Sequence, residues 1–444
     1  MILYNKVVYS PTRSVRARIM ECTIDSSSSS SASNNKEVIE TLPSIDFDLP
    51  LNGLHEGSEL GSALNPISLN PSWEEENEIK LVHALVTCAE SVKSGDLARA
   101  GLLIQDMQRH LLPLVNTWQG IGKVAWSFIK ALTCRVFSSS SLREISFLEN
   151  AIDVLYYPFY EASPCLKFAH FTANQWIFEA FDGHERVHVV DLNLMQGLQW
   201  PALIQALALR PGGPPAVRLT GINPPSPEIG PSLADLAHSM NVRFTFRGLQ
   251  VSHLEDIQPW TLQLSSKEAL AINSIMQLHK LIGRSPRSNS PAPIYQALSW
   301  VRMAGPRIVT VVEQEVNHNV DDFLYRFTEA LNYYSTMFDS LEAGGMEVNS
   351  LAEMYVQREI MNVIGCEGEA RFERHEPFDT WKLRMSAAGF EPVVLKKNAF
   401  TQASMLLNMS SAEGFCADEK EGSLNLGWHG RPLISASAWR PNAN

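Results

Sequence analysis

Apolar positions change their spacing part-way along the chain, and the change separates two kinds of predicted structure. Between residues 74 and 182 they recur every three or four positions, as at Leu81 and Leu85, which is typical of amphipathic helices. Gly95 can end the first of these helices, and Asp96 can cap the second. We therefore predict that residues 74–182 form a mainly helical cap subdomain.

The leucine-rich spacing of this region is also compatible with a coiled-coil dimer. A coiled coil needs several uninterrupted heptads, whereas Gly95 and Pro113 interrupt the pattern after a few turns. We expect these helices to pack against the α/β core of the same chain. An exposed part of them remains a candidate surface for self-association.

From residue 183 to residue 440, short apolar runs alternate with helical spacing. Val187–Asp191 is typical of a buried parallel strand that ends in a carboxylate, and Pro201 lies in the first turn of the following helix. Further strands are predicted at Val217–Thr220, Val242–Phe246, Ala269–Asn273 and Arg307–Val312, and helices at Leu233–Met240, Phe323–Leu341, Glu353–Gly365 and Trp381–Ala388. Such alternation predicts parallel pairing with right-handed crossovers. The predicted fold class is α/β, with a doubly wound, mainly parallel sheet of the methyltransferase-like type.

The end of the chain has a different pattern. Strands are predicted at Val393–Leu395, Leu424–Trp428 and Leu433–Trp439, with a helix at Phe400–Met409. Gly430–Pro432 is a turn signal between the last two strands. We predict an antiparallel strand at one edge of the sheet, so that residues 183–440 form the α/β core and residues 441–444 a short tail.

Residues 1–73 differ in composition from the rest of the chain. Six consecutive serines, Ser26–Ser31, precede an Asn-rich and acidic segment, and few large apolar residues recur there. Such a segment cannot bury enough apolar surface to offset its ordering entropy, so we predict a disordered tail. Met1 and Met20 are alternative start positions that the sequence does not distinguish.

Charge and cysteine usage restrict the class of protein. The formal net charge of -12 and the pI near 5.5 disfavour sequence-independent binding to nucleic acid, which relies on clustered Lys and Arg. A sequence-specific DNA-binding factor is a separate hypothesis, but no basic helix or zinc-module spacing supports it. The six cysteines are scattered singly, as in proteins with reduced thiols. The acidic balance favours protein partners. No apolar run approaches the roughly 20 residues that cross a bilayer, so we expect no membrane insertion.

The first predicted strand directs attention to Asp191, because ligands of doubly wound sheets bind beyond the carboxyl ends of the strands. The enzyme alternative is an S-adenosylmethionine site, with Asp191 beside the donor and Glu313 at the end of the fifth strand. Such a turn normally carries several glycines, whereas this one has only Gly197. Thr220–Pro225, after the second strand, contains no carboxylate that could hold ribose hydroxyls. Since fold alone does not establish catalysis, we expect no catalytic, cofactor or metal site.

Several polar and aromatic residues have a structural interpretation beside the functional one. His188 lies in an apolar strand and is predicted to be a hydrogen-bonded structural histidine. Asp191 can brace the following helix by accepting its free N–H groups. Arg371–Glu376 predicts a charge network, because no nucleophile accompanies it. Trp428 and Trp439 are expected to cover the core or an edge, although their area also suits an anchor for a partner.

Several long motifs, in order along the chain, resemble the plant GRAS family. Val187-His188-Val189-Val190-Asp191 is similar to the V-H-I-I-D core of that family, and leucine-rich regions flank it at about 78–137 and 233–264. Arg371–Glu376 resembles part of the P-FY-RE segment, and Ser437-Ala438-Trp439 resembles the terminal S-A-W block. The resemblance implies that residues 74–440 form a GRAS domain.

Four further segments, 81–85, 199–203, 210–215 and 311–315, are most similar to the DELLA subgroup. This resemblance implies a nuclear repressor of gibberellin-dependent growth that binds DNA-bound transcription factors, for example of the zinc-finger or helix-loop-helix type. The Asp-Glu-Leu-Leu-Ala and Thr-Val-His-Tyr-Asn-Pro segments, through which family members meet the gibberellin receptor, have no counterpart in residues 1–73. Receptor binding is therefore not carried over, and we expect a hormone-insensitive co-regulator.

The candidate partner-binding residues come from the helical region and from the family motifs. Grooves between amphipathic helices over Leu81–Leu114 are the preferred docking area, and the alternative is that these leucines all face inward. A homodimer or heterodimer with other GRAS proteins is a further partner hypothesis. The candidates are Leu81, Leu85, Leu103, Leu111, Val187, His188, Val189, Val190, Asp191, Arg371, Glu373, Arg374, Ser437, Ala438 and Trp439.

Overall fold

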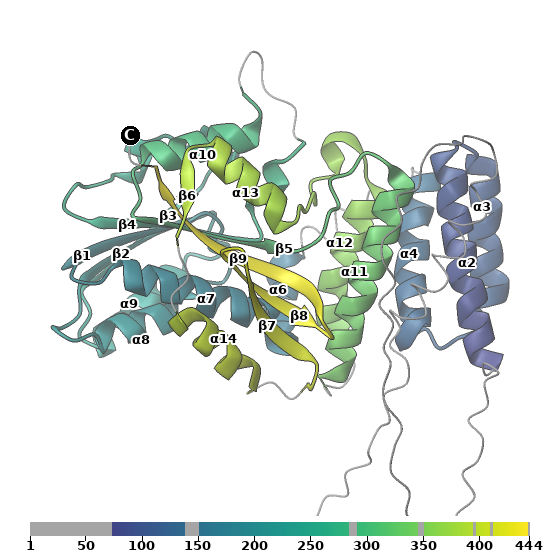
Figure 1. Cartoon of the computed structure of the whole chain (residues 1–444), viewed down its shortest axis with the longest axis horizontal. Helices are drawn as coiled ribbons and strands as arrows, with labels where there is room; N and C mark the ends of the chain where they lie inside the picture. The colour runs from purple at the N-terminus through teal and green to yellow at the C-terminus, as the bar shows by residue number, and fades with distance from the viewer. Residues whose placement is uncertain are drawn as a thin grey trace, which may run out of the picture.

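A computed structural model describes residues 73–137, 151–283, 291–344, 350–393, 397–408 and 412–442. The predicted disorder of the N-terminal tail and the two alternative start positions fall outside these residues. Figure 1 shows a sheet with helices on both faces and, at one end of it, a bundle of long helices.

Nine strands form one sheet within the described residues, and its larger half is parallel, which confirms the predicted fold class. The parallel half has the order β3-β2-β1-β4-β5, and β9, β8 and β7 continue the sheet beyond β5 in antiparallel pairing. The parallel strands are β1 (Arg186–Asp191), β2 (Ala216–Ile222), β3 (Phe244–Leu249), β4 (Ala269–Ile275) and β5 (Ile308–Gln314). The others are β6 (Phe390–Pro392), β7 (Phe415–Lys420), β8 (Ser423–Trp428) and β9 (Arg431–Pro441).

The antiparallel part is larger than the single edge strand that the sequence predicted. β9 is not an edge, because it lies between β5 and β8 and also pairs with β6, and β7 forms the outer edge. The sequence missed β7 because acidic and basic residues at its exposed positions hide the apolar alternation of a strand. The strand predicted at Val393–Leu395 does not overlap β6, which ends at Pro392; Val393 is not in a strand, and residues 394–396 lie outside the described residues.

Four parallel strands extend beyond their predicted ends, and two of them, β2 and β3, continue to Ile222 and Leu249. β4 continues to Ile275 and β5 to Gln314, so Glu313 lies inside a strand and not after it. β3 starts at Phe244, two residues later than predicted. Apolar patterning could not find the end of β5 because its last two residues are polar yet buried, with hydrogen-bond partners of their own.

The two faces of the parallel strands pack against different helices. One face carries α7 (Pro164–Ala180), α8 (Trp200–Ala208), α9 (Ile229–Ser239) and α14 (Lys397–Asn408), and the other carries α10 (Pro293–Met303) and α13 (Phe378–Ala387) (Figure 1). Neighbouring residues of β1 separate accordingly, with Val189 in the first apolar core and Val190 in the second. Burial on both faces explains why β1 is an uninterrupted apolar run.

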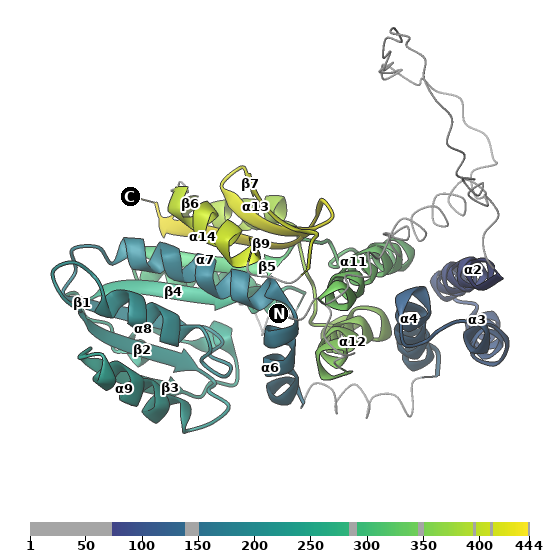
Figure 2. The same cartoon turned by 90° about the horizontal axis from the view of Figure 1, so that it is seen from below.

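The helical bundle combines segments from the beginning and the middle of the chain. Its N-terminal members are α2 (Trp73–Lys93), α3 (Leu97–Asp106) and α4 (Gly120–Phe137). α4 packs against α11 (Phe323–Ala343) and α12 (Ser350–Gly365), which follow β5, and α2 packs against α11. α3 packs against α2 and α4, and α12 also contacts α6 (Ile152–Ala162) (Figure 2). The buried ammonium group of Lys123 joins α4 to α11 and α12, since its Nζ lies 2.9 Å from a carboxylate oxygen of Glu342 and 2.7 Å from one of Glu353. The helical region thus extends beyond residues 74–182. The predicted boundary between a helical cap at 74–182 and an α/β core at 183–440 stays a prediction.

Long helices in the bundle raise the question of membrane insertion. Among the described helices, none is both long enough and apolar enough to span a bilayer.

Candidate functional site

The carboxyl end of β1 is the place where a doubly wound sheet would bind a small ligand, and Asp191 is buried there. Its Oδ2 accepts a hydrogen bond from Trp200 Nε1 at 3.0 Å, and its Oδ1 accepts from the backbone N–H of Asn193 at 3.2 Å and from Asn273 Nδ2 at 3.3 Å. Burial raises the pKa of this carboxyl to about 6. Asp191 therefore ties the β1 turn to the start of α8 and to β4, but it reaches α8 through the Trp200 indole and not, as the sequence suggested, through free backbone N–H groups of that helix.

The space beside Asp191 is small. The cavity there has a volume of about 30 Å³ and is lined by residues that include His170, Leu194, Gln199 and Lys280. Typical ligand sites measure roughly 300–1,000 Å³, so this space is comparable to a single water molecule.

Two glycines near this turn serve side-chain contacts within the protein. A Cβ on Gly221 would lie 2.6 Å from Leu194 Cδ2, and one on Gly197 would lie 2.9 Å from Ile229 Cγ2. Both positions therefore let apolar side chains of the chain itself approach the backbone. Leu194 occupies the space over β2 that a ligand would need.

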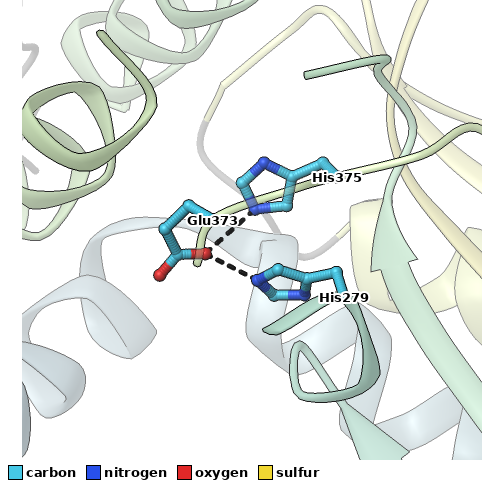
Figure 3. Close-up of side chains that lie close together, drawn as sticks. All are labelled: His279, Glu373 and His375. Atoms are coloured by element: carbon cyan, nitrogen blue, oxygen red, sulfur yellow. Dashed lines mark hydrogen bonds and ion pairs between the residues drawn. The ribbon is translucent and has the colours of Figure 1, made fainter. Parts of the chain in front are cut away.

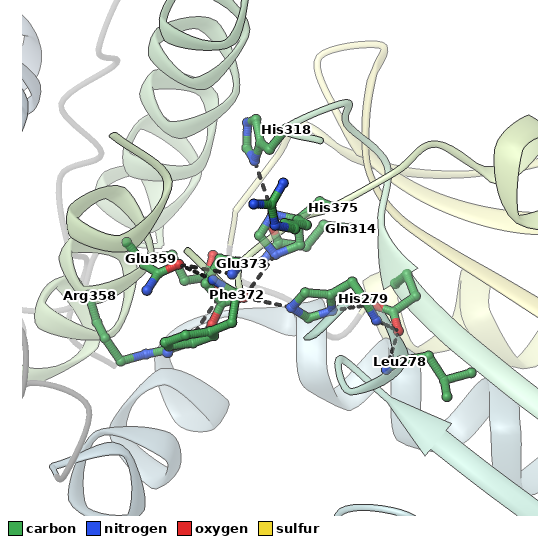
Figure 4. Close-up of polar contacts among 12 residues, drawn as sticks. Leu278, His279, Gln314, His318, Arg358, Glu359, Phe372, Glu373 and His375 are labelled. Carbon is green, nitrogen blue, oxygen red and sulfur yellow. Dashed lines mark hydrogen bonds and ion pairs between the residues drawn. The ribbon is translucent and has the colours of Figure 1, made fainter. Parts of the chain in front are cut away.

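A second polar cluster lies at the carboxyl ends of β4 and β5 and is charged. His279, in the short helix η5 (Leu278–Leu281) after β4, lies between two carboxylates: its Nδ1 is 2.6 Å from Glu313 Oε2 and its Nε2 is 2.6 Å from Glu373 Oε2. Glu313 Oε1 also accepts the backbone N–H groups of Leu278 at 3.0 Å and of His279 at 3.3 Å (Figure 4). Burial acts to lower the pKa of His279, but Glu313 and Glu373 raise it to about 9.

Glu373 connects this cluster to the helical bundle. Its Oε1 accepts a hydrogen bond from Arg358 Nη1, on α12, at 2.8 Å, and its backbone N–H donates to Asn362 Oδ1 at 2.9 Å. Burial acts to raise the pKa of Glu373, but Arg358 and the neighbouring Lys280 and His279 hold it well below its usual range. We call His279, Glu313, Glu373, His375 and Arg358 the junction cluster.

The two predicted arginines beside Glu373 have partners other than Glu373. Arg371 Nη1 donates to the His318 carbonyl at 2.8 Å, and Arg374 Nε donates to the Arg371 carbonyl at 2.9 Å. Both side chains are buried, and an ion pair joins Arg371 to Glu367. The segment is thus rich in buried charge, as predicted, but its arginines pair outside it, and Glu376 pairs with Arg384.

His188 has the structural role predicted for it. Its side chain is buried on β1, with Nε2 2.8 Å from Thr220 Oγ1 and Nδ1 3.0 Å from Arg218 Nη2. Burial, reinforced by Arg218 and Arg247, lowers its pKa to about 3. The neighbouring Val187, Val189 and Val190 are core side chains of the same strand.

The Ser437-Ala438-Trp439 block lies within β9, and all three side chains are buried. Ser437 Oγ donates to the Val311 carbonyl at 3.2 Å and accepts from Trp439 Nε1 at 2.9 Å. Trp428, on β8, is also buried and donates to Asp339 Oδ2 at 2.8 Å. These tryptophans thus fill the core, as the simpler sequence interpretation expected.

The candidate leucines of the helical region differ in exposure. Leu81 and Leu85 are fully buried, whereas Leu103 and Leu111 are partly buried. Among the apolar side chains of this region that reach solvent are Leu97, Leu102, Leu114 and Trp118. Leu81 and Leu85 therefore contribute to the interior, and a docking surface here must be formed by their exposed neighbours.

Sequence reasoning missed two members of the junction cluster, His279 and Arg358, and also His318, which contacts His375. One signal was present, because His279 lies four residues after the end of β4, at the same edge of the sheet as Asp191. Arg358 gave no signal, since an arginine on an amphipathic helix is normally exposed.

The arrangement of motifs matches a known family. Residues 81–440 match the GRAS domain family. The chain belongs to the GRAS family.

Named relatives of this GRAS protein lie among plant growth regulators. It is 51% identical over 383 residues to Protein SLENDER RICE1-LIKE 1 of Oryza sativa subsp. japonica, which covers 84% of this chain and 76% of the relative. It is 47% identical to DELLA protein SLN1 of Hordeum vulgare, covering 82% of this chain but only 63% of that protein. These relatives support a growth-regulator role of the GRAS and DELLA kind and are regulatory proteins, not known enzymes.

A solved GRAS structure has the same fold. The crystal structure of SCL7 in Oryza sativa aligns with a TM-score of 0.67 at 30% identity, covering 81% of this chain and 99% of the SCL7 chain.

Proposed function

We propose that this GRAS protein is a nuclear transcriptional co-regulator that represses gibberellin-related growth by binding DNA-bound transcription factors. The observation that carries the proposal is its 51% identity to Protein SLENDER RICE1-LIKE 1, together with the DELLA proteins among its relatives. The expected partners are transcription factors of the zinc-finger or helix-loop-helix type and other GRAS proteins.

The geometry favours binding of proteins over catalysis. The cavity at Asp191 measures about 30 Å³, and Leu194 fills the adjoining space. A methyltransferase would need room for S-adenosylmethionine there. Isothermal titration of the full chain with S-adenosylmethionine should give no saturable heat, and saturable binding would restore the enzyme hypothesis.

The exposed apolar side chains of the bundle are the best candidates for partner contacts. Leu102 is 69% exposed on α3, and Trp118 is 73% exposed before α4. Tryptophan is enriched among the few residues that contribute most of the binding energy of an interface, and Leu102 adds exposed apolar area on the neighbouring helix. We expect Leu102→Glu and Trp118→Glu to weaken repression of a gibberellin-responsive reporter in plant protoplasts, because a charge there opposes apolar contact.

A matched control separates docking from folding. Leu209 is 86% exposed after α8, remote from the bundle, so Leu209→Glu should leave repression unchanged. All three variants should keep the wild-type melting temperature. If the Leu102 and Trp118 variants repress as strongly as wild type, this face is not the docking surface. If wild type itself fails to repress, the co-regulator proposal is wrong.

Nuclear localisation and independence from hormone receptor binding need separate tests. A fluorescent fusion of the full chain should accumulate in nuclei. A pull-down with the gibberellin receptor should recover no complex with or without hormone, whereas a hormone-dependent complex would overturn the proposed hormone insensitivity.

A further inference from the structure

Three side chains of the junction cluster direct ligand atoms at one another: His279, Glu373 and His375. These atoms all lie within 4.8 Å of one another, and the three residues are buried. His279 Nε2 is 2.6 Å and His375 Nε2 is 3.2 Å from Glu373 Oε2. Figure 3 shows both imidazole rings turned toward the same carboxylate.

The second imidazole leaves a nitrogen without a hydrogen bond. His375 Nε2 is close to Glu373 but not aligned with it, and it makes no hydrogen bond although the side chain is 0% exposed. Its other nitrogen, Nδ1, lies 3.0 Å from His318 Nδ1. When that Nδ1 carries the proton, Nε2 presents a lone pair to a carboxylate, an arrangement that a cation between them would satisfy.

The groups behind these three side chains also suit a metal site. Histidines that bind metals usually donate their other ring N–H to a carboxylate, carbonyl or water. His279 Nδ1 lies 2.6 Å from Glu313 Oε2, and Glu373 keeps its second oxygen on Arg358 at 2.8 Å. His279 and Glu373 are thus each held in orientation by a neighbour, Glu313 or Arg358, that is not one of the three ligand groups.

We propose that His279 Nε2, Glu373 Oε2 and His375 Nε2 bind one Zn²⁺ ion. Two imidazoles and a carboxylate are a common protein ligand set for this ion, with a water completing the tetrahedron. Ligand atoms around tetrahedral zinc lie about 3.3 Å apart. Of the three pairs, His375 Nε2 and Glu373 Oε2 at 3.2 Å already fit, and His279 Nε2 and Glu373 Oε2 must open by about 0.7 Å. The two imidazole nitrogens lie within 4.8 Å of each other and must settle at the same spacing. The ion replaces the proton shared by His279 and Glu373.

The proposed ion has a structural role. His279 follows β4, whereas Glu373 and His375 belong to the segment between η6 (Gly368–Ala370) and α13. A zinc ion would therefore fasten the carboxyl edge of the sheet to the segment that Arg358 anchors on the bundle.

The test starts from the full wild-type chain, purified without a metal-chelating tag and treated with EDTA. Added Zn²⁺ should bind at one equivalent per chain after gel filtration, by elemental mass spectrometry, and should raise the melting temperature. Co²⁺ should give the visible absorption of a tetrahedral site. Substoichiometric zinc together with an unchanged melting temperature would overturn the proposal and leave a proton as the occupant.

Two variants and one control locate the ion. His375→Gln should abolish stoichiometric zinc, whereas His170→Gln, which changes a buried histidine outside the cluster, should retain it. Glu313→Gln should weaken the zinc affinity by about 10- to 100-fold in a chelator competition, because it loosens the orientation of His279. If His375→Gln does not fold, the zinc affinity of Glu313→Gln decides whether the ion binds at this cluster. Unchanged affinity in Glu313→Gln, or equal zinc content in the two histidine variants, would exclude this site.

Discussion

Two buried polar clusters lie at the same edge of the sheet and stabilise their carboxylates in different ways. Around Asp191, neutral groups do so: an indole N–H, an amide and a backbone N–H donate to one carboxylate. In the junction cluster, His279 and Arg358 place cationic groups against Glu313 and Glu373. The first arrangement closes the classical ligand position of the fold, whereas the second makes a charged connection between sheet and bundle. Position at a strand end thus does not by itself define a site; the neighbouring groups do.

The largest expected effect comes from removing the central carboxylate of the junction cluster. Glu373→Ala leaves His279 and Arg358 buried without their shared counter-charge, which should lower the free energy of unfolding by about 3–5 kcal/mol. Urea unfolding in EDTA measures this loss without any contribution from bound metal.

A solvent-exposed ion pair is the control for that variant. Glu391 pairs with Arg440 where both side chains are substantially exposed, so Glu391→Ala should cost less than about 1 kcal/mol. Equal losses in the two variants would mean that the buried charges contribute no more than surface charges, and the contrast between the clusters would fail.

The Asp191 cluster should show its character in the pH dependence of stability. A carboxyl whose pKa is raised on folding, here to about 6, stabilises the fold at low pH, and this contribution is lost as the pH rises through 6. Asp191→Asn cannot ionise, so its stability relative to wild type should increase by about 2–3 kcal/mol between pH 4 and pH 8. The measurement is urea unfolding of both proteins across this range. A stability difference between Asp191→Asn and wild type that does not vary with pH would show that burial does not raise the pKa of Asp191.

A smaller effect of opposite sign is expected from His170, which lines the same cavity. Burial lowers its pKa to about 3, and its Nε2 contacts Tyr156 Oη at 3.0 Å. A histidine whose pKa is lowered on folding stabilises the fold at pH values above the pKa that it has in the unfolded chain, about 6.5. This contribution is lost as the pH falls from there toward the lower pKa of the folded protein. Between pH 7 and pH 5 wild type should lose about 2 kcal/mol that His170→Gln does not lose. Parallel pH profiles of the two proteins would contradict this expectation.

The sequence revealed the parallel half of the sheet and the Asp191 strand end because both depend on local patterns. The apolar run of β1, the carboxylate that ends it and the proline in the first turn of α8 all lie within one short stretch of sequence. β7 escaped because one of its faces is solvated and charged. The junction cluster escaped because His279 and Glu373 are 94 positions apart and meet only through the tertiary fold. Their burial also contradicts the usual exposure of charged residues. The position of His279 after β4 and the charged segment around Glu373 were visible separately, but no pattern along the chain showed that the two residues meet.

The construction of the bundle from early and middle segments has a consequence for synthesis in the cell. Lys123 and Glu353, which join α4 to α12, are 230 positions apart. At about 5–20 residues per second, the apolar faces of α2 and α4 that pack on α11 and α12 remain without those partners for roughly 10–50 s. During that interval the nascent chain exposes surface that chaperones recognise, and fragments ending before α11 should aggregate when expressed alone.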